Sequence, residues 1–163
     1  MDGPVVCPPL TGVYELNGSG SRRGLGLLRF CNWLLNKADE HGAEMIFYEA
    51  PIYAGMPGTG NVKFLLIGLA AMTEMIAASI PIRCENQTVQ TIRKNFISNG
   101  HGNKAMVMAR CDQLRWEYGG DDNRADAAAA WFSAKLDFDR AFRFETVTPL
   151  FSNAAVRAQG KVA

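Results

Sequence analysis

The stretch that most constrains the fold is a short apolar run that ends in a carboxylate, within residues 44–51. Met45 to Tyr48 are large apolar residues, with Gly42 before them and Pro51 after them. Such a run is typical of a buried strand in an α/β sheet. Glu49 ends the run, at the place where open α/β sheets carry ligands and catalytic groups. The alternative is an edge glutamate that simply meets solvent.

Length and composition fit one α/β globular domain with a hydrophobic core, since the chain has 163 residues and is 48% hydrophobic. We expect this domain to span residues 1–143 and a weakly patterned tail to span 144–163. The net charge of +1 gives no general argument for binding nucleic acid or a membrane. The apolar run 64–80 contains Glu74 and is short for a membrane span, so we expect no membrane partner.

The four cysteines are scattered at positions 7, 31, 84 and 111, without C-x-x-C spacing. We therefore expect reduced, small core residues rather than a disulfide or zinc framework. No signal-peptide pattern opens the sequence, so the expected location is the cytoplasm.

The remaining patterns predict strands that alternate with helices. Short strand signals lie at 4–7 and 12–16, and a helix from about residue 21 ends at Gly42. Asp2-Gly3 favours a hairpin turn that has only one arm, so we expect the opening strand to be missing. Further helices are predicted at 61–80, 86–97, 103–118 and 121–136, with a strand at 82–84 and a weak pattern beyond about 142. The 61–80 helix is apolar on nearly every face, which favours burial by the sheet and by a second subunit.

A second acidic cluster lies far downstream, at residues 121–126. Asp122 and Asp126 are four apart, so on a helix their carboxylates point the same way. Helix capping explains Asp121 and suits Asp122, but it does not explain Asp126, which precedes an alanine run typical of close packing. A buried charge needs a partner. A divalent cation shared with Glu49 is a natural one, because Mg²⁺ prefers oxygen ligands.

Charge is unevenly distributed along the chain. Residues 83–115 contain six basic and two acidic side chains, and residues 117–145 contain four basic and seven acidic ones. A metal-dependent enzyme that acts on a polyanion needs such a pairing of basic and acidic segments. The same arrangement also arises by chance in solvated helices.

An ordered set of pieces runs through the chain. In order, these are Tyr48-Glu49-Ala50-Pro51, the apolar helix, the short strand, Thr88-Val89 with Arg93-Lys94, Gly102-Asn103-Lys104-Ala105 and Asp122-Asn123-Arg124-Ala125-Asp126-Ala127. This set resembles RuvC-type Holliday junction resolvases, and most of all the small phage and prophage members. The resemblance runs from about residue 2 to 136 and implies a ribonuclease H-like mixed sheet flanked by helices, in a homodimer that cuts branched DNA with two Mg²⁺ ions in a bacterial or phage-infected cell. Mn²⁺ is expected to substitute for Mg²⁺.

The resemblance also implies roles for single residues. Glu49 matches the second of four acidic metal positions, and Asp126 matches the last. The third falls on Asn123 by spacing, but we expect the neighbouring Asp122 to be the ligand and Asn123 to be a possible oxygen donor. The first belongs on the opening strand that we expect to be missing. The implied catalytic residues are Glu49, Asp122, Asp126 and Lys104, and the implied DNA-backbone contacts are Arg93, Lys94, His101 and Lys104.

Two other functions fit the same residues. One is a non-catalytic protein that binds DNA junctions with the same fold and a broken metal site. The other is a different ribonuclease H-like protein, such as an exonuclease or an ATP-binding relative. The chain has no phosphate-loop glycine pattern, so we expect no nucleotide cofactor.

Overall fold

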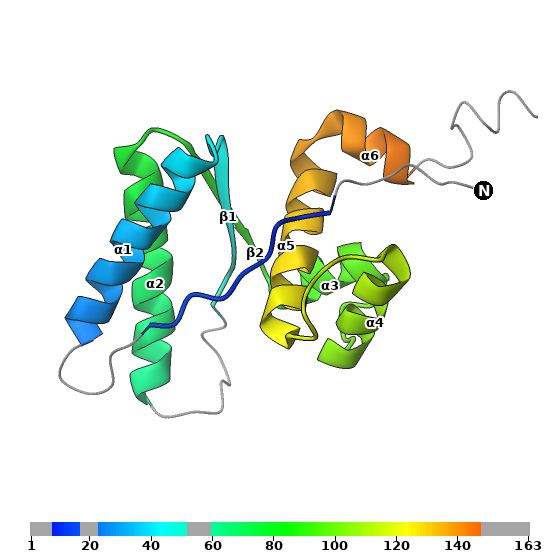
Figure 1. Cartoon of the computed structure of the whole chain (residues 1–163), viewed down its shortest axis with the longest axis horizontal. Coiled ribbons are helices and arrows are strands. Elements are labelled where there is room, and N and C mark those ends of the chain that lie inside the picture. The colour runs from blue at the N-terminus through cyan, green and yellow to red at the C-terminus, as the bar shows by residue number, and fades with distance from the viewer. Residues whose placement is uncertain (1–7, 17–22, 52–59, 148–163) are drawn as a thin grey trace, which may run out of the picture. The chain divides into compact units, whose positions relative to one another are not determined.

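The chain divides into two compact units. One unit contains residues 13–91, and the other contains residues 1–12 together with residues 92–163. A computed structural model describes residues 8–16, 23–51 and 60–147, without the side chains of 60, 61 and 144–147. Figure 1 shows the labelled elements.

The unit of residues 13–91 is built on a parallel strand pair joined by a helix (Figure 1). In chain order it contains α1 (Arg23–Glu40), β1 (Met45–Glu49), α2 (Gly60–Ser79) and β2 (Arg83–Gln87). Parallel neighbours require a crossover connection, and α2 lies within it and contacts both strands. The register sets Tyr48 opposite Asn86 and Glu49 opposite Gln87.

The core of this unit lies where α1 and α2 meet each other and the strands. Cys31 of α1, Ile46 of β1, and Ile76 and Ala77 of α2 are buried together. The predicted strand is confirmed, with Glu49 as its last residue. The predicted helix end at Gly42 is also confirmed, since α1 stops at Glu40 and Gly42 has the left-handed φ of +56°.

The strand predicted at residues 12–16 is wrong, because residues 8–16 form neither strand nor helix. A short β-prone segment becomes a strand only where a neighbouring strand accepts its hydrogen bonds. Tyr14 instead stacks on Trp33 of α1, with ring centroids 4.9 Å apart. The segment predicted as a strand at 4–7 and the Asp2-Gly3 turn lie outside the described residues. Within the described part of the chain, the sheet has two parallel strands rather than the expected mixed arrangement.

The second strand is longer and more polar than predicted. β2 continues through Glu85 to Asn86 and Gln87, and the sequence pattern places the last two at the start of a helix. These residues pair along β1, so backbone hydrogen bonding rather than apolar content makes them a strand. The next helix accordingly begins at Val89.

The other unit is helical in the described residues. Its elements are α3 (Val89–Ile97, from Ile92 onward), α4 (Lys104–Leu114), α5 (Asp122–Phe138) and α6 (Arg140–Val147). α5 contacts α4 and α6. Its alanines 125, 128, 129 and 134 are buried, which confirms close packing for Ala128 and Ala129 of the alanine run, whereas Ala127 is exposed. An aromatic cluster completes the core, formed by Phe96, Trp116, Trp131, Phe132 and Phe142.

Two helix boundaries in this unit differ from the predicted ones. α4 ends at Leu114 rather than at Tyr118, because Arg115 adopts the left-handed conformation with a φ of 56°. Its N–H donates to the carbonyls of Asp112 and Cys111, which closes the helix as a glycine would. α6 crosses the point where the sequence pattern weakens, so a helix was missed there. The predicted division into residues 1–143 and 144–163 stays a prediction.

α2 exposes much apolar surface. Val62, Phe64, Ile67 and Met75 are 51%, 72%, 41% and 54% exposed. Among the described helices, α2 alone is long and apolar enough to cross a membrane, by length and composition, and 17% of its window Val62–Ser79 is buried. Core helices of water-soluble proteins meet the same criterion.

Candidate functional site

The site is organised by the start of α5. Asp121 has extended backbone and caps this helix, because its side chain accepts hydrogen bonds from the N–H groups of Asn123 and Arg124, both at 2.9 Å. The predicted capping role of Asp121 is thus confirmed. Asp122 and Asp126 then lie one turn apart on α5, which is the spacing that turns two side chains to the same face.

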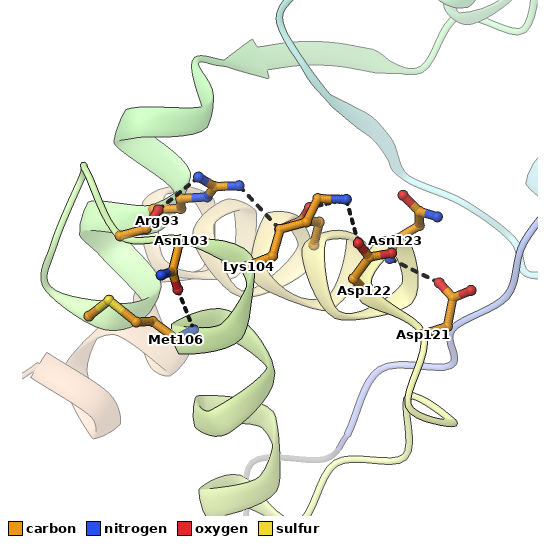
Figure 2. A network of polar contacts seen from close by, with 9 residues as sticks. Arg93, Asn103, Lys104, Met106, Asp121, Asp122 and Asn123 are labelled. Atoms are coloured by element: carbon orange, nitrogen blue, oxygen red, sulfur yellow. Dashed lines mark hydrogen bonds and ion pairs between the residues drawn. The ribbon is translucent and has the colours of Figure 1, made fainter.

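A lysine from α4 reaches both of these carboxylates, as Figure 2 shows for Lys104 and Asp122. The Lys104 ammonium nitrogen Nζ lies 2.7 Å from Asp122 Oδ2 and 3.9 Å from Asp126 Oδ2. Lys104 stands in the first turn of α4 because Asn103 caps that helix, accepting from the Met106 N–H at 3.0 Å. Two helix caps therefore set the position of one lysine against two aspartates.

The two carboxylates differ in their electrostatic environment. The hydrogen bond from Lys104 lowers the pKa of Asp122 below its ordinary value, and the same bond raises the pKa of Lys104. Burial raises the pKa of Asp126, and this effect outweighs the opposing influence of Arg93 and Lys104. Both cations lie 3.8–3.9 Å from Asp126, which is beyond hydrogen-bonding distance, so neither compensates fully for its lost hydration.

Arg93 of α3 contacts both Asp126 and the loop before α4. One terminal nitrogen donates to the Gly102 carbonyl at 2.8 Å, and the other lies 3.8 Å from Asp126 Oδ1. The Arg93 side chain is 19% exposed, and its Nε is buried without a hydrogen-bond partner in the described structure. A guanidinium placed in this way fixes the loop before α4 and contributes positive charge beside Asp126.

This arrangement fits a divalent cation in part. One cationic centre, the Lys104 nitrogen, lies 2.7 Å from an oxygen of Asp122 and 3.9 Å from an oxygen of Asp126. A Mg²⁺–oxygen bond is roughly 2.0–2.1 Å long, so an ion shared by both carboxylates would lie nearer to Asp126 than the ammonium does. Carboxylate oxygens are the ligands that Mg²⁺ and Mn²⁺ prefer, and Mg²⁺ commonly keeps several waters. Within the ranges described, however, no group of three or more His, Cys, Asp or Glu side chains is close enough to hold a metal.

The other predicted site residues are dispersed. Glu49 is exposed at the carboxyl end of β1, in the unit of residues 13–91, so its approach to Asp126 stays a prediction. Asn123 is exposed beside Asp122. Lys94 and His101 are exposed, and the backbone N–H of His101 donates to the Asn99 side chain at 3.0 Å.

A polar network that sequence reasoning missed lies at the end of β1. The Tyr48 hydroxyl donates to Glu74 of α2 at 2.5 Å and accepts from the Asn86 side chain of β2 at 3.3 Å. It explains why an apolar helix contains a carboxylate. The sequence signal for this network is Glu74, the single acidic residue in α2.

Comparison with solved structures finds RuvC of Thermus thermophilus, with a TM-score of 0.59 and 10% sequence identity, over 74% of this chain and 75% of that chain. At this identity, the likeness concerns the fold alone. A scan against protein families finds no match, and a search of curated proteins finds no similar sequence. The fold thus resembles that of RuvC, and the likeness to phage and prophage members stays a prediction.

Proposed function

We propose that the chain is a metal-dependent endonuclease with a ribonuclease H-like fold that cuts Holliday junctions or other branched DNA. The fold likeness to RuvC supports this proposal. The observation that carries it is the pair of carboxylates on one face of α5, with the Lys104 ammonium nitrogen 2.7 Å from one and 3.9 Å from the other. Paired carboxylates of this kind hold the ions of two-metal phosphodiesterases.

In this proposal, Asp122 and Asp126 hold the metal, and Glu49 and Asn123 supply further oxygen ligands. Bound Mg²⁺ or Mn²⁺ would provide Lewis acidity and an activated water for phosphodiester hydrolysis. Arg93 contacts both Asp126 and the Gly102 carbonyl, and so holds the loop before α4 close to Asp126.

DNA binding is assigned to exposed cationic side chains near this site. Lys94 and His101 contact backbone phosphates, and Lys104 contacts the phosphate nearest the carboxylates. Arg93 is partly committed to the Gly102 carbonyl and Asp126, so its contribution to the DNA is mainly its charge.

Cleavage of a synthetic four-way junction in the presence of Mg²⁺ or Mn²⁺ tests the proposal. Asp126→Asn removes a ligand charge but keeps the side-chain shape, and we expect it to lower the cleavage rate by at least about 100-fold, as expected when a metal contributing several kcal/mol of transition-state stabilisation is lost. Asp39→Asn, an exposed aspartate on α1, is the matched control. Equal rates for wild type and Asp126→Asn would contradict the proposal.

A second candidate is a protein that binds DNA junctions without cutting them. One observation favours it: the position that a metal would take between Asp122 and Asp126 is approached by Lys104. Junction binding by gel shift, with no cleavage at any Mg²⁺ or Mn²⁺ concentration, would support this candidate over the nuclease.

We also propose that the protein acts as a homodimer through α2. The exposed positions 64, 67, 71, 75 and 78 recur at helical spacing along one side of this helix. Phe64, Ile67 and Met75 are large, and the small Ala71 and Ala78 on the same side permit close approach of a second helix.

A further inference from the structure

We propose that the Lys104 ammonium is a built-in counter-cation of the Asp122/Asp126 pair, and that a divalent cation binds this pair only by displacing it. The inference rests on the proposed function, because it takes these two carboxylates as metal ligands. It adds that the chain's own lysine competes for them.

The geometry makes lysine and metal alternatives rather than partners. Nζ approaches the Oδ2 atom of each aspartate, at 2.7 and 3.9 Å. An ammonium group has three donors and no lone pair, so it cannot ligate a metal. A metal bound to the same oxygens would also lie within a few ångströms of the ammonium charge and be repelled by it.

Lys104 is placed so that it can leave. Its side chain is 48% exposed, and exposed ion pairs of this kind are weak. Lysine in the first turn of α4 is opposed by the helix macrodipole, so the helix itself does little to keep the ammonium there. A flexible four-carbon stem can swing it into solvent.

Asp126 keeps a cationic neighbour when Lys104 moves away. Arg93 approaches Oδ1 of Asp126, whereas Lys104 approaches Oδ2. Loss of the lysine contact therefore leaves Asp126 with one cationic neighbour, at Oδ1, and leaves Oδ2 open to a new cation.

Mn²⁺ binding tests the inference directly, with free Mn²⁺ measured by electron paramagnetic resonance in the absence of DNA. Lys104→Met and Lys104→Gln remove the ammonium at similar side-chain length, and Lys104→Arg keeps a cation. We expect the first two to bind Mn²⁺ about two- to fivefold more tightly than wild type, the range set by exposed ion pairs, and Lys104→Arg to resemble wild type. Lys37→Met is the control, since it removes a lysine paired with the single carboxylate of Glu40.

The outcomes separate this inference from the proposed function. Tighter binding in Lys104→Met and Lys104→Gln, or binding in these variants alone, supports the exchange. If these two variants bind Mn²⁺ no more tightly than wild type, the exchange is overturned but the metal site is not. An absence of Mn²⁺ binding in every variant overturns both the exchange and the metal-dependent nuclease. The same tightening in Lys37→Met would attribute the effect to net charge and also overturn the exchange.

Discussion

Tyr48 shows how one side chain can decide which way a neighbouring residue points. Its hydroxyl is bound to Glu74 of α2, so this face of β1 is turned toward the helix. Successive residues of a strand point to opposite faces, so Glu49 is directed to the other face of the strand. The alternation along β1 thus directs a candidate metal ligand away from the face that carries the contact between Tyr48 and Glu74.

Removing the Tyr48 hydroxyl tests this contact. We expect Tyr48→Phe to lower the free energy of unfolding by about 1.5 kcal/mol, the lower end for hydrogen bonds to charged groups, because the contact is exposed. Burial and the bond to Glu74 raise the pKa of Tyr48, so the neutral form is favoured in the folded state. Its contribution is complete below the unfolded pKa of about 10 and is lost as the pH rises above it.

Urea unfolding at pH 7 and at pH values above 10 measures this prediction. Tyr14→Phe is the control, because its ring stacks on Trp33 and the substitution keeps the ring. The stability difference between wild type and Tyr48→Phe should shrink as the pH rises. If Tyr48→Phe and Tyr14→Phe lower the free energy of unfolding equally at pH 7, the assigned role of the Tyr48 hydroxyl is contradicted.

The loop between α3 and α4 passes close to Ile97 at Gly102, where a larger residue would not fit. A Cβ atom on Gly102 would lie 2.3 Å from the Cδ1 atom of Ile97 and 3.2 Å from the Asn99 carbonyl oxygen. The carbonyl of Gly102 also accepts the hydrogen bond from Arg93. The loop between α3 and α4 therefore couples the position of Arg93 to that of the helix bearing Lys104.

Two glycine-to-alanine substitutions should have opposite effects on stability. We expect Gly102→Ala to destabilise the fold by about 1–2 kcal/mol, because Ile97 must shift to admit the methyl group. Gly26 lies inside α1, and a Cβ there meets nothing within 4 Å. Gly26→Ala should stabilise by about 0.5–1 kcal/mol through the better helix propensity of alanine. Thermal unfolding measures both, and destabilisation by Gly26→Ala would contradict the open space described at that position.

Local patterns predicted most elements, and tertiary contacts account for the rest. The apolar run before Glu49 and the helical spacing of α1, α2 and α5 were sufficient for their assignment. The polar half of β2 was not predictable, since Asn86 is in a strand only because β1 pairs with it. The i, i+4 spacing predicted that Asp122 and Asp126 share a face. The approach of Lys104 was not predictable, because it depends on how α4 packs on α5.

At the scale of the whole molecule, one unit is formed by segments from both ends of the described chain. Thr11 donates to the Glu117 carbonyl at 3.1 Å, and Arg124 donates to the Thr11 hydroxyl at 3.0 Å. The segment at residues 8–12 thus belongs with α4 and α5 rather than with the residues that follow it in sequence.

The proposed homodimer through α2 can be tested by changing one exposed apolar residue of this helix. We expect Phe64→Lys to convert a dimer to a monomer, because it places a charge at the most exposed large apolar residue of the contact. Leu10→Lys changes an equally apolar residue, 92% exposed, in the other unit and should leave the mass unchanged. Light scattering at micromolar concentration measures both. A monomeric wild type, or dissociation by Leu10→Lys as well, would contradict a specific interface on α2.

The parallel pairing of β1 with β2 has a consequence for synthesis of the protein. β1 finds its partner only after residues 83–87 have left the ribosome, because α2 lies between the two strands in the chain. Until then, a nascent chain presents an unpaired strand edge together with the apolar α2. Exposed edges and apolar surfaces of this kind are the ones that cause nascent polypeptides to aggregate. This interval of translation is when the chain most needs protection by a chaperone.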